Sequence, residues 1–216
     1  MRSSNPTRRP ALYEEAPATA ALAALCTLFW LAEFVFPSFI GIGMALIPAR
    51  LTGYITLIDP AVPAILTPVS MTFVHAGLGH LFLNMVFLLF IGRFVERLLG
   101  SGRFLALYFV SGIAGSLLEV ALAPESTVPH VGASGAIAGV FAAHAMIFGR
   151  RNGRTSERNR ALQLAAVWIG LQLLIGLIFN TGGTDAGGIA IWAHVGGFLA
   201  GLVLALPMAR DALTSR

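Results

Sequence analysis

A serine and a histidine are the residues of this sequence whose types and setting suit covalent chemistry. Ser134 lies in the tetrapeptide Gly-Ala-Ser-Gly at 132–135, which opens one long apolar segment, and His194 lies near the start of another. Both segments are long and uncharged enough to span a bilayer, where a polar side chain is costly and usually functional. A serine nucleophile and a histidine base that meet inside a membrane suit the hydrolysis of a peptide bond there.

The composition predicts a membrane protein. Of the 216 residues, 56% are apolar and 11% are charged, and the mean hydropathy is +0.80, whereas an average soluble protein is about 25% charged. Six apolar segments approach the roughly 20 residues that a helix needs to cross a bilayer. They lie near residues 18–37, 78–98, 104–123, 132–149, 161–180 and 189–208. The expected fold is all-α, a polytopic bundle of six transmembrane helices.

The distribution of arginine predicts how these helices are oriented. Of the 14 basic residues, all but Arg50 lie in the tails or in loops on one side of the predicted bundle. Because such residues accumulate on the cytoplasmic side, we expect both termini in the cytoplasm and the chain in a cell membrane, most simply the inner membrane of a bacterium. Arginines beside anionic lipid account for the net charge of +4, so lipid is an expected partner and nucleic acid is not.

One domain is expected at residues 18–208, between short cytoplasmic tails at 1–17 and 209–216. The first tail is polar and has no apolar stretch, so we expect no cleavable signal peptide. The longest connection, 38–77, is apolar but interrupted by prolines, and we expect it to fold against the outer surface of the membrane. The chain has a single cysteine, which excludes an intramolecular disulfide.

Three polar side chains lie at matching depth. Each is 16 or 17 residues from an arginine at the cytoplasmic end of its own segment, or roughly 24–25 Å along a helix. The pairs are Ser134 with Arg150, His194 with Arg210, and His80 with Arg97. In a hydrocarbon core about 30 Å thick, this level lies roughly 5 Å below the outer face.

Small residues indicate which faces of the serine and histidine segments meet. Glycines spaced four residues apart follow both side chains, and this spacing lets helix backbones approach closely in lipid. They are Gly135 and Gly139 in one segment, and Gly197 and Gly201 in the other. Packing of these faces would bring Ser134 and His194 within hydrogen-bonding distance; the alternative is that the glycines serve bundle packing alone.

Two donors accompany the pair. His80 and Asn84 share a helical face, and both can donate hydrogen bonds to a developing oxyanion. Packing is the alternative role for each. A zinc site at His75, His80 and His194 is disfavoured because no carboxylate or cysteine accompanies these histidines, so we expect neither metal nor cofactor.

The sequence offers no obvious third member of a triad. Glu33, Glu119 and Asp185 lie near the outer ends of segments or in a loop, and we interpret them as interfacial residues. His144 lies ten residues beyond Ser134 and is expected to pack in the bundle. His130, on a loop close to Ser134, is the alternative candidate for the base.

Three segments resemble the motifs of the rhomboid intramembrane serine proteases. Residues 75–84 (His-Ala-Gly-Leu-Gly-His-Leu-Phe-Leu-Asn) resemble the H-x-x-x-x-H-x-x-x-N motif of that family. Residues 132–135 resemble its G-x-S-G motif, and residues 193–201 resemble its A-H-x-x-G-x-x-x-G motif. The order, spacing and six-span topology also agree over residues 18–208, in the compact bacterial form.

The resemblance implies a serine endopeptidase that cleaves single-span membrane proteins near the outer face of the membrane. By position it implies Ser134 as nucleophile and His194 as general base, with the Ser134 amide, His80 and Asn84 as oxyanion donors. Gly92 and Glu96 resemble residues at the polar end of the second transmembrane helix in that family. The supporting positions that it implies are His75, Gly132, Gly135, Gly197 and Gly201.

Some features leave alternatives open. The Trp-Arg pair found in many rhomboids is replaced here by Leu-Thr-Pro at 66–68, so the bracing of the connection at 38–77 is not predicted. The glycine-rich run at 181–188 is either a cap over the site or an ordinary connection. An inactive rhomboid-like protein that binds transmembrane helices is disfavoured because both Ser134 and His194 are present. A small transporter is disfavoured because the polar residues gather at one level.

Overall fold

The structure is a computed structural model that describes residues 15–57, 60–148 and 191–214, together with the single positions 159, 163, 167 and 170. The predicted glycine-rich run at 181–188 lies outside the described residues. So does the predicted segment near 161–180, except at positions 163, 167 and 170.

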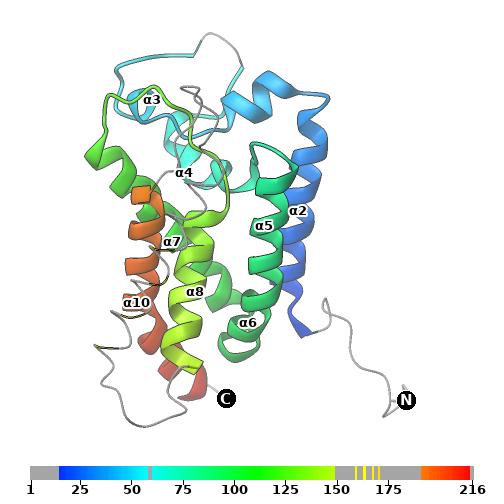
Figure 1. The fold of residues 1–216 in the computed structure, drawn as a ribbon, viewed down its shortest axis with the longest axis vertical. Coiled ribbons are helices and arrows are strands. Elements are labelled where there is room, and N and C mark those ends of the chain that lie inside the picture. Colours follow the sequence, from blue (N-terminus) through cyan, green and yellow to red (C-terminus); the bar gives the residue numbers. More distant parts are fainter. Residues whose placement is uncertain are drawn as a thin grey trace.

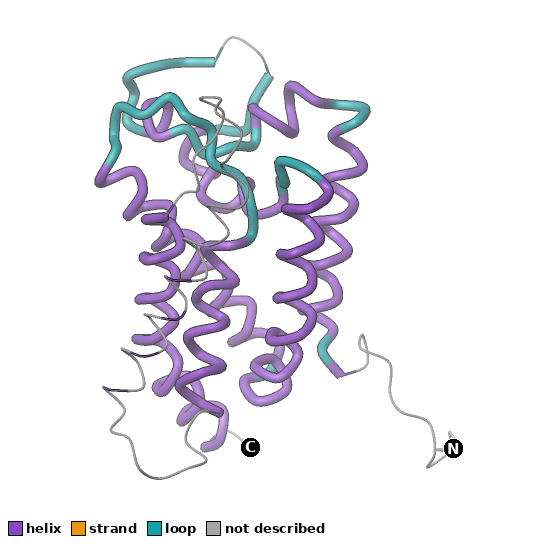
Figure 2. The backbone as a smooth tube through the Cα atoms, viewed as in Figure 1, coloured by secondary structure: helices purple, strands orange, loops and turns teal. Residues whose placement is uncertain are grey.

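All regular elements of the described part are helical. In chain order they are α2 (Pro17–Glu33), η1 (Ser38–Gly43), α3 (Pro48–Leu51), η2 (Ala64–Leu66), α4 (Thr67–Ser70), η3 (Met71–Phe73), α5 (Leu78–Phe87), η4 (Leu88–Gly92), α6 (Arg93–Leu99), α7 (Ser101–Leu122), α8 (Ser134–Phe148) and α10 (Ile191–Thr214). The long helices stand side by side, and the short helices α3 and α4 and the loops around them gather at one end of the bundle, the upper end in Figure 1 and Figure 2.

The described residues contain three helices long and apolar enough to cross a membrane. They are Leu78–Leu99, formed by α5, η4 and α6 without a break, Ser101–Leu122 and Ile191–Thr214. Shorter apolar helices span Pro17–Glu33, Ala64–Phe73 and Ser134–Phe148. The expectation of an all-α membrane protein is therefore confirmed, and the number of spans stays a prediction.

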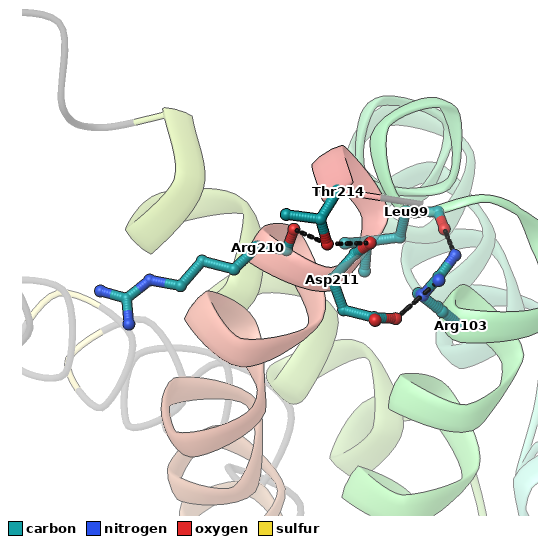
Figure 3. A network of polar contacts seen from close by, with 5 residues as sticks. All are labelled: Leu99, Arg103, Arg210, Asp211 and Thr214. Atoms are coloured by element: carbon teal, nitrogen blue, oxygen red, sulfur yellow. Dashed lines mark hydrogen bonds and ion pairs between the residues drawn. The ribbon is translucent and has the colours of Figure 1, made fainter. Parts of the chain in front are cut away.

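The last helix extends further than the sequence predicts. α10 continues to Thr214, so most of the expected tail at 209–216 is helical. Arg103 of α7 contacts these added turns: its Nε donates to Asp211 Oδ2 at 2.6 Å, and the same guanidinium donates to the carbonyl of Leu99 at 3.4 Å (Figure 3). The hydroxyl of Thr214 donates to the carbonyls of Arg210 and Asp211 in the same turn. The bond from Arg103 to Asp211 joins the lower end of α10 to α7, and the Thr214 bonds stabilise the last turn of α10 itself.

Glu96 joins three helices at that same end of the bundle. The carboxylate is 2% exposed and accepts hydrogen bonds from the backbone amides of Ala18 and Thr19 in the first turn of α2. It also accepts from the hydroxyls of Thr19 and Ser101, both at 2.7 Å. The first amides of a helix lack acceptors within it, so one carboxylate satisfies the start of α2 and binds it to α6 and α7.

The connection at 38–77 is held by backbone pairing and by Arg50. Leu46 and His130 exchange backbone hydrogen bonds of 3.0 and 2.8 Å, which tie the connection to the chain before α8. The half-buried guanidinium of Arg50 donates to the carbonyls of Gly43, at 3.3 Å, and Val62. Arg50, which the charge pattern sets apart from the other arginines, therefore braces a connection that lacks the Trp-Arg pair.

The centre of the bundle is formed by α7, α8 and α10, whose backbones touch at glycines. A Cβ on Gly139 would lie 2.9 Å from the carbonyl oxygen of Gly197, and one on Gly201 would lie 2.5 Å from Gly139 Cα. A Cβ on Gly196 would lie 2.9 Å from the carbonyl oxygen of Ala114 in α7. The small-residue faces predicted on the serine and histidine segments do pack against each other.

Substituting Gly201 with Ala tests this packing. The added methyl overlaps the backbone of α8, so we expect a loss of about 1–3 kcal/mol in stability, as overpacking typically costs. Gly102→Ala in α7 is the matched control, because a Cβ there meets nothing within 4 Å and alanine favours helix. Melting temperatures in detergent measure both changes. Equal melting temperatures for Gly201→Ala and Gly102→Ala would contradict the close contact of α8 with α10.

Candidate active site

Ser134 and His194 form a hydrogen-bonded pair at the upper end of the bundle. Ser134 is the first residue of α8, and His194 lies in the first turn of α10. With His194 neutral, the serine hydroxyl donates to Nε2 across 2.6 Å. His194 is 5% exposed, whereas Ser134 is half-buried. The serine is thus less enclosed than the histidine, an arrangement suited to a nucleophile and its base.

The chain reaches Ser134 through a turn that requires glycine. Gly132 has φ +119°, a backbone conformation that L side chains rarely adopt. A Cβ at this position would also lie 2.7 Å from Cε1 of His80. The Gly132 amide donates to the carbonyl of Met71 at 2.9 Å, which anchors the turn on η3. Gly132 therefore lets α8 begin directly beside the His80 ring.

The two predicted oxyanion donors lie on one face of α5 and differ in their surroundings. His80 is half-buried with its ring against Gly132. Asn84 is 6% exposed, and its Nδ2 donates to the carbonyl of His80 at 2.9 Å. An amide nitrogen has two hydrogens, so this bond orients Asn84 and leaves a second donor. The structure brings His80 to the serine turn and holds Asn84 one helical turn further along α5.

His75 supports His80 from the loop before α5. The side chain is 1% exposed, its ring centroid lies 5.2 Å from that of His80, and Nδ1 lies 3.3 Å from the carbonyl of Phe73. Burial lowers the pKa of His75 to about 4, and the nearby His80 acts in the same direction. His75 is therefore a neutral packing residue at pH 7. Within the described part of the chain, no group of three histidine, cysteine or acidic side chains is arranged to hold a metal.

The interpretation of Glu119 as an interfacial residue is wrong. The residue is 6% exposed, and its Oε2 accepts a hydrogen bond from the backbone amide of Ala193 at 3.1 Å. Its Oε1 lies 3.8 Å from Nε2 of His130. The distance of Glu119 from the end of its apolar segment does not reveal that α10 covers this side of α7.

His130 belongs to this contact, and within the described part of the chain Ser134 and His194 have no third member. Burial lowers the pKa of His130 from its ordinary value, and the Glu119 carboxylate opposes the shift. Among the described residues, the Ser134 hydroxyl is hydrogen-bonded to His194 and not to His130. Within the same residues, Nδ1 of His194 is buried and has no partner. The geometry is that of a dyad.

Comparison with known proteins identifies the family of this chain. A family model described as the rhomboid domain matches residues 63–211, which include every motif discussed above. The chain belongs to the rhomboid family. It is accordingly a multi-pass membrane protein of a family of intramembrane proteases.

Relatives of this rhomboid include proteins named as proteases and one named as inactive. It is 35% identical over 150 residues to the rhomboid protease GluP of Bacillus subtilis (strain 168), a match that covers 67% of this chain and 26% of the relative. It is 34% identical over 136 residues to Rhomboid-like protease 3 of Toxoplasma gondii (63% and 49%). It is 29% identical over 125 residues to Inactive RHOMBOID-like protein 8 of Arabidopsis thaliana (58% and 33%). The matched segments span less than half the length of these relatives.

The stability of this rhomboid is expected to fall as the pH falls below about 6.5. The unfolded chain protonates His75 near its ordinary pKa of about 6.5, whereas the folded chain does so only near 4. The folded state binds this proton less well than the unfolded state does. The resulting loss in the free energy of unfolding reaches about 3 kcal/mol below pH 4. Chemical unfolding of wild type and His75→Gln at pH 7 and pH 4.5 measures this contribution. An identical pH dependence in both proteins would show that His75 is not the group responsible.

Proposed function

We propose that this rhomboid protein is an intramembrane serine endopeptidase in which Ser134 is the nucleophile and His194 is the general base. The hydrogen bond of 2.6 Å between Ser134 Oγ and His194 Nε2 carries the proposal. It joins a half-buried serine to an enclosed imidazole, in a bundle whose described part contains three helices with the length and hydropathy of membrane spans. The reaction class is therefore acyl transfer to serine, followed by hydrolysis.

The proposed reaction follows from these atoms. Ser134 Oγ attacks the carbonyl carbon of the scissile peptide while its proton passes to His194 Nε2. The imidazolium then returns that proton to the departing amine, and water releases the acyl group from Ser134 with the same histidine as base. A base without an acidic partner suffices where the oxyanion site supplies much of the stabilisation.

The proposed oxyanion site lies at the start of α8. The amide of Ser134 is one of the first in its helix, where amides have no acceptor within the helix and the positive end of the helix dipole lies. The His80 ring lies against the same turn, and Asn84 follows on the same face of α5. These three donors would bind the developing negative charge.

The proposed setting is a six-helix domain at 18–208 with both termini in the cytoplasm. The charge pattern supports this orientation, and the level of Ser134, roughly 5 Å below the outer face, follows from the helix rise. The substrate in this proposal is a single-span membrane protein whose outer end unwinds, because peptide bonds within a helix are shielded. An inactive, helix-binding rhomboid is the alternative, which the retained Ser134 and His194 oppose.

Labelling with a fluorophosphonate tests the two catalytic assignments. We expect the detergent-purified protein to be labelled at Ser134 and to cleave single-span substrates. Ser134→Ala should abolish both, and His194→Ala should slow both by about 10²–10⁴-fold, as loss of a general base does. His144→Ala is the control, since this histidine packs between Phe94 and Phe148 and should leave the labelling rate unchanged. Equal cleavage by wild type and Ser134→Ala would refute the enzyme assignment.

Substituting the two side-chain donors tests the oxyanion assignment. His80→Ala and Asn84→Ala should each lower kcat by about 10²–10³-fold, the typical effect of losing one donor, and should retain residual activity. Phe82→Ala, on the same helix and 62% exposed, should leave kcat unchanged. If the variant at His80 or Asn84 cleaves substrate at the wild-type rate, that residue serves packing and is not an oxyanion donor.

A further inference from the structure

A buried carboxylate on α7 caps the helix that carries His194. Oε2 of Glu119 accepts the hydrogen bond from the Ala193 amide at 3.1 Å, and the residue that follows Ala193 is His194. Ala193 lies in the first turn of α10, where amides lack acceptors within the helix and a negative charge meets the positive end of the helix dipole. Glu119 therefore fixes the start of α10 next to the proposed base.

The carbonyl side of Ala193 is fixed as well. Gly115 lies one turn before Glu119 on α7, and a Cβ there would lie 3.0 Å from the carbonyl carbon of Ala193. A Cβ on Gly135 of α8 would lie 3.2 Å from the carbonyl oxygen of Ala193. The backbone that precedes His194 is thus held by a hydrogen bond on one side and by close helix contact on the other.

The second oxygen of Glu119 faces the chain that leads to Ser134. Oε1 lies 3.8 Å from Nε2 of His130, and both side chains are 8% exposed. His130 exchanges backbone hydrogen bonds with Leu46, and Gly132 follows two residues later with its amide bonded to Met71. One carboxylate therefore lies between the two segments that supply the dyad.

We propose that Glu119 is a positioning residue that holds His194 within reach of Ser134, acting through the Ala193 amide. This inference rests on the proposed function of the dyad. Nδ1 of His194 has no hydrogen-bond partner among the described residues. The inference explains how the ring is nevertheless oriented, because the backbone beside His194 is held in place instead of the ring itself.

Two substitutions of similar size separate positioning from simple packing. Glu119→Gln keeps an oxygen that accepts from Ala193, whereas Glu119→Leu fills the same space without an acceptor. We expect Glu119→Leu to lower kcat on the order of 10²-fold, as a misplacement of about 1 Å can, with KM nearly unchanged. Glu119→Gln should retain most of the wild-type kcat. Both are measured by substrate cleavage and fluorophosphonate labelling at a temperature where each variant is folded.

Glu96→Gln is the matched control for stability. Glu96 is also a buried carboxylate that caps a helix, but it acts on α2, and α6 lies at the end of the bundle opposite the start of α8 (Figure 1). This variant should lower the melting temperature and leave the labelling rate of the folded protein unchanged. The inference is overturned if folded Glu119→Leu reacts at the wild-type rate, or if Glu119→Gln is as slow as Glu119→Leu.

Amide hydrogen exchange tests the contact independently of catalysis. Peptides that cover residues 191–198 should exchange faster in Glu119→Leu than in wild type and Glu119→Gln. Unchanged exchange in Glu119→Leu would overturn the inference even if the protein is an active protease. If the wild type is neither labelled nor active, the proposed function fails, while faster exchange in Glu119→Leu would still establish the cap on α10.

Discussion

The backbone contact between α8 and α10 is the constraint on which the rest of the structure depends. A hydrogen bond of 2.6 Å between Ser134 and His194 requires the two helices to lie closer than larger side chains permit. Glycines make this possible, since a Cβ on Gly139 would come within 2.9 Å of the carbonyl oxygen of Gly197. In lipid there is no hydrophobic drive between helices, so dispersion across such close surfaces is a main source of association. The interface that stabilises the bundle is also the one that forms the dyad.

Buried carboxylates solve a second problem that the membrane imposes. Backbone amides at the start of a helix need acceptors, and lipid provides none. Glu96 satisfies the first turn of α2, and Glu119 accepts from the first turn of α10, both from the protein interior. The two carboxylates act at opposite ends of the bundle. Each joins a helix start to a neighbouring helix, so satisfying the backbone also determines where the helices lie.

The segments outside the long helices position the serine. The turn at Gly132 is anchored on Met71, and the chain before it pairs with Leu46. The connection that contains Leu46 is in turn braced by Arg50 through the carbonyls of Gly43 and Val62. A nucleophile at the first residue of a helix depends on this path, because its orientation follows the turn by which the chain enters the helix.

The sequence by itself determined the all-helical membrane character and the family resemblance, and it predicted the pairing of Ser134 with His194 while leaving His130 as an alternative base. Hydropathy, the positions of arginines and the spacing of glycines are local patterns, and they predict depth and helical face because the helix rise and period are constant. Only the tertiary structure decided the contacts of Glu119, His130 and Arg50, and the continuation of α10 to Thr214. The partners of these residues lie on other elements of the fold. A charged residue near the end of an apolar segment gives the same sequence pattern whether lipid, water or a neighbouring helix covers its side chain.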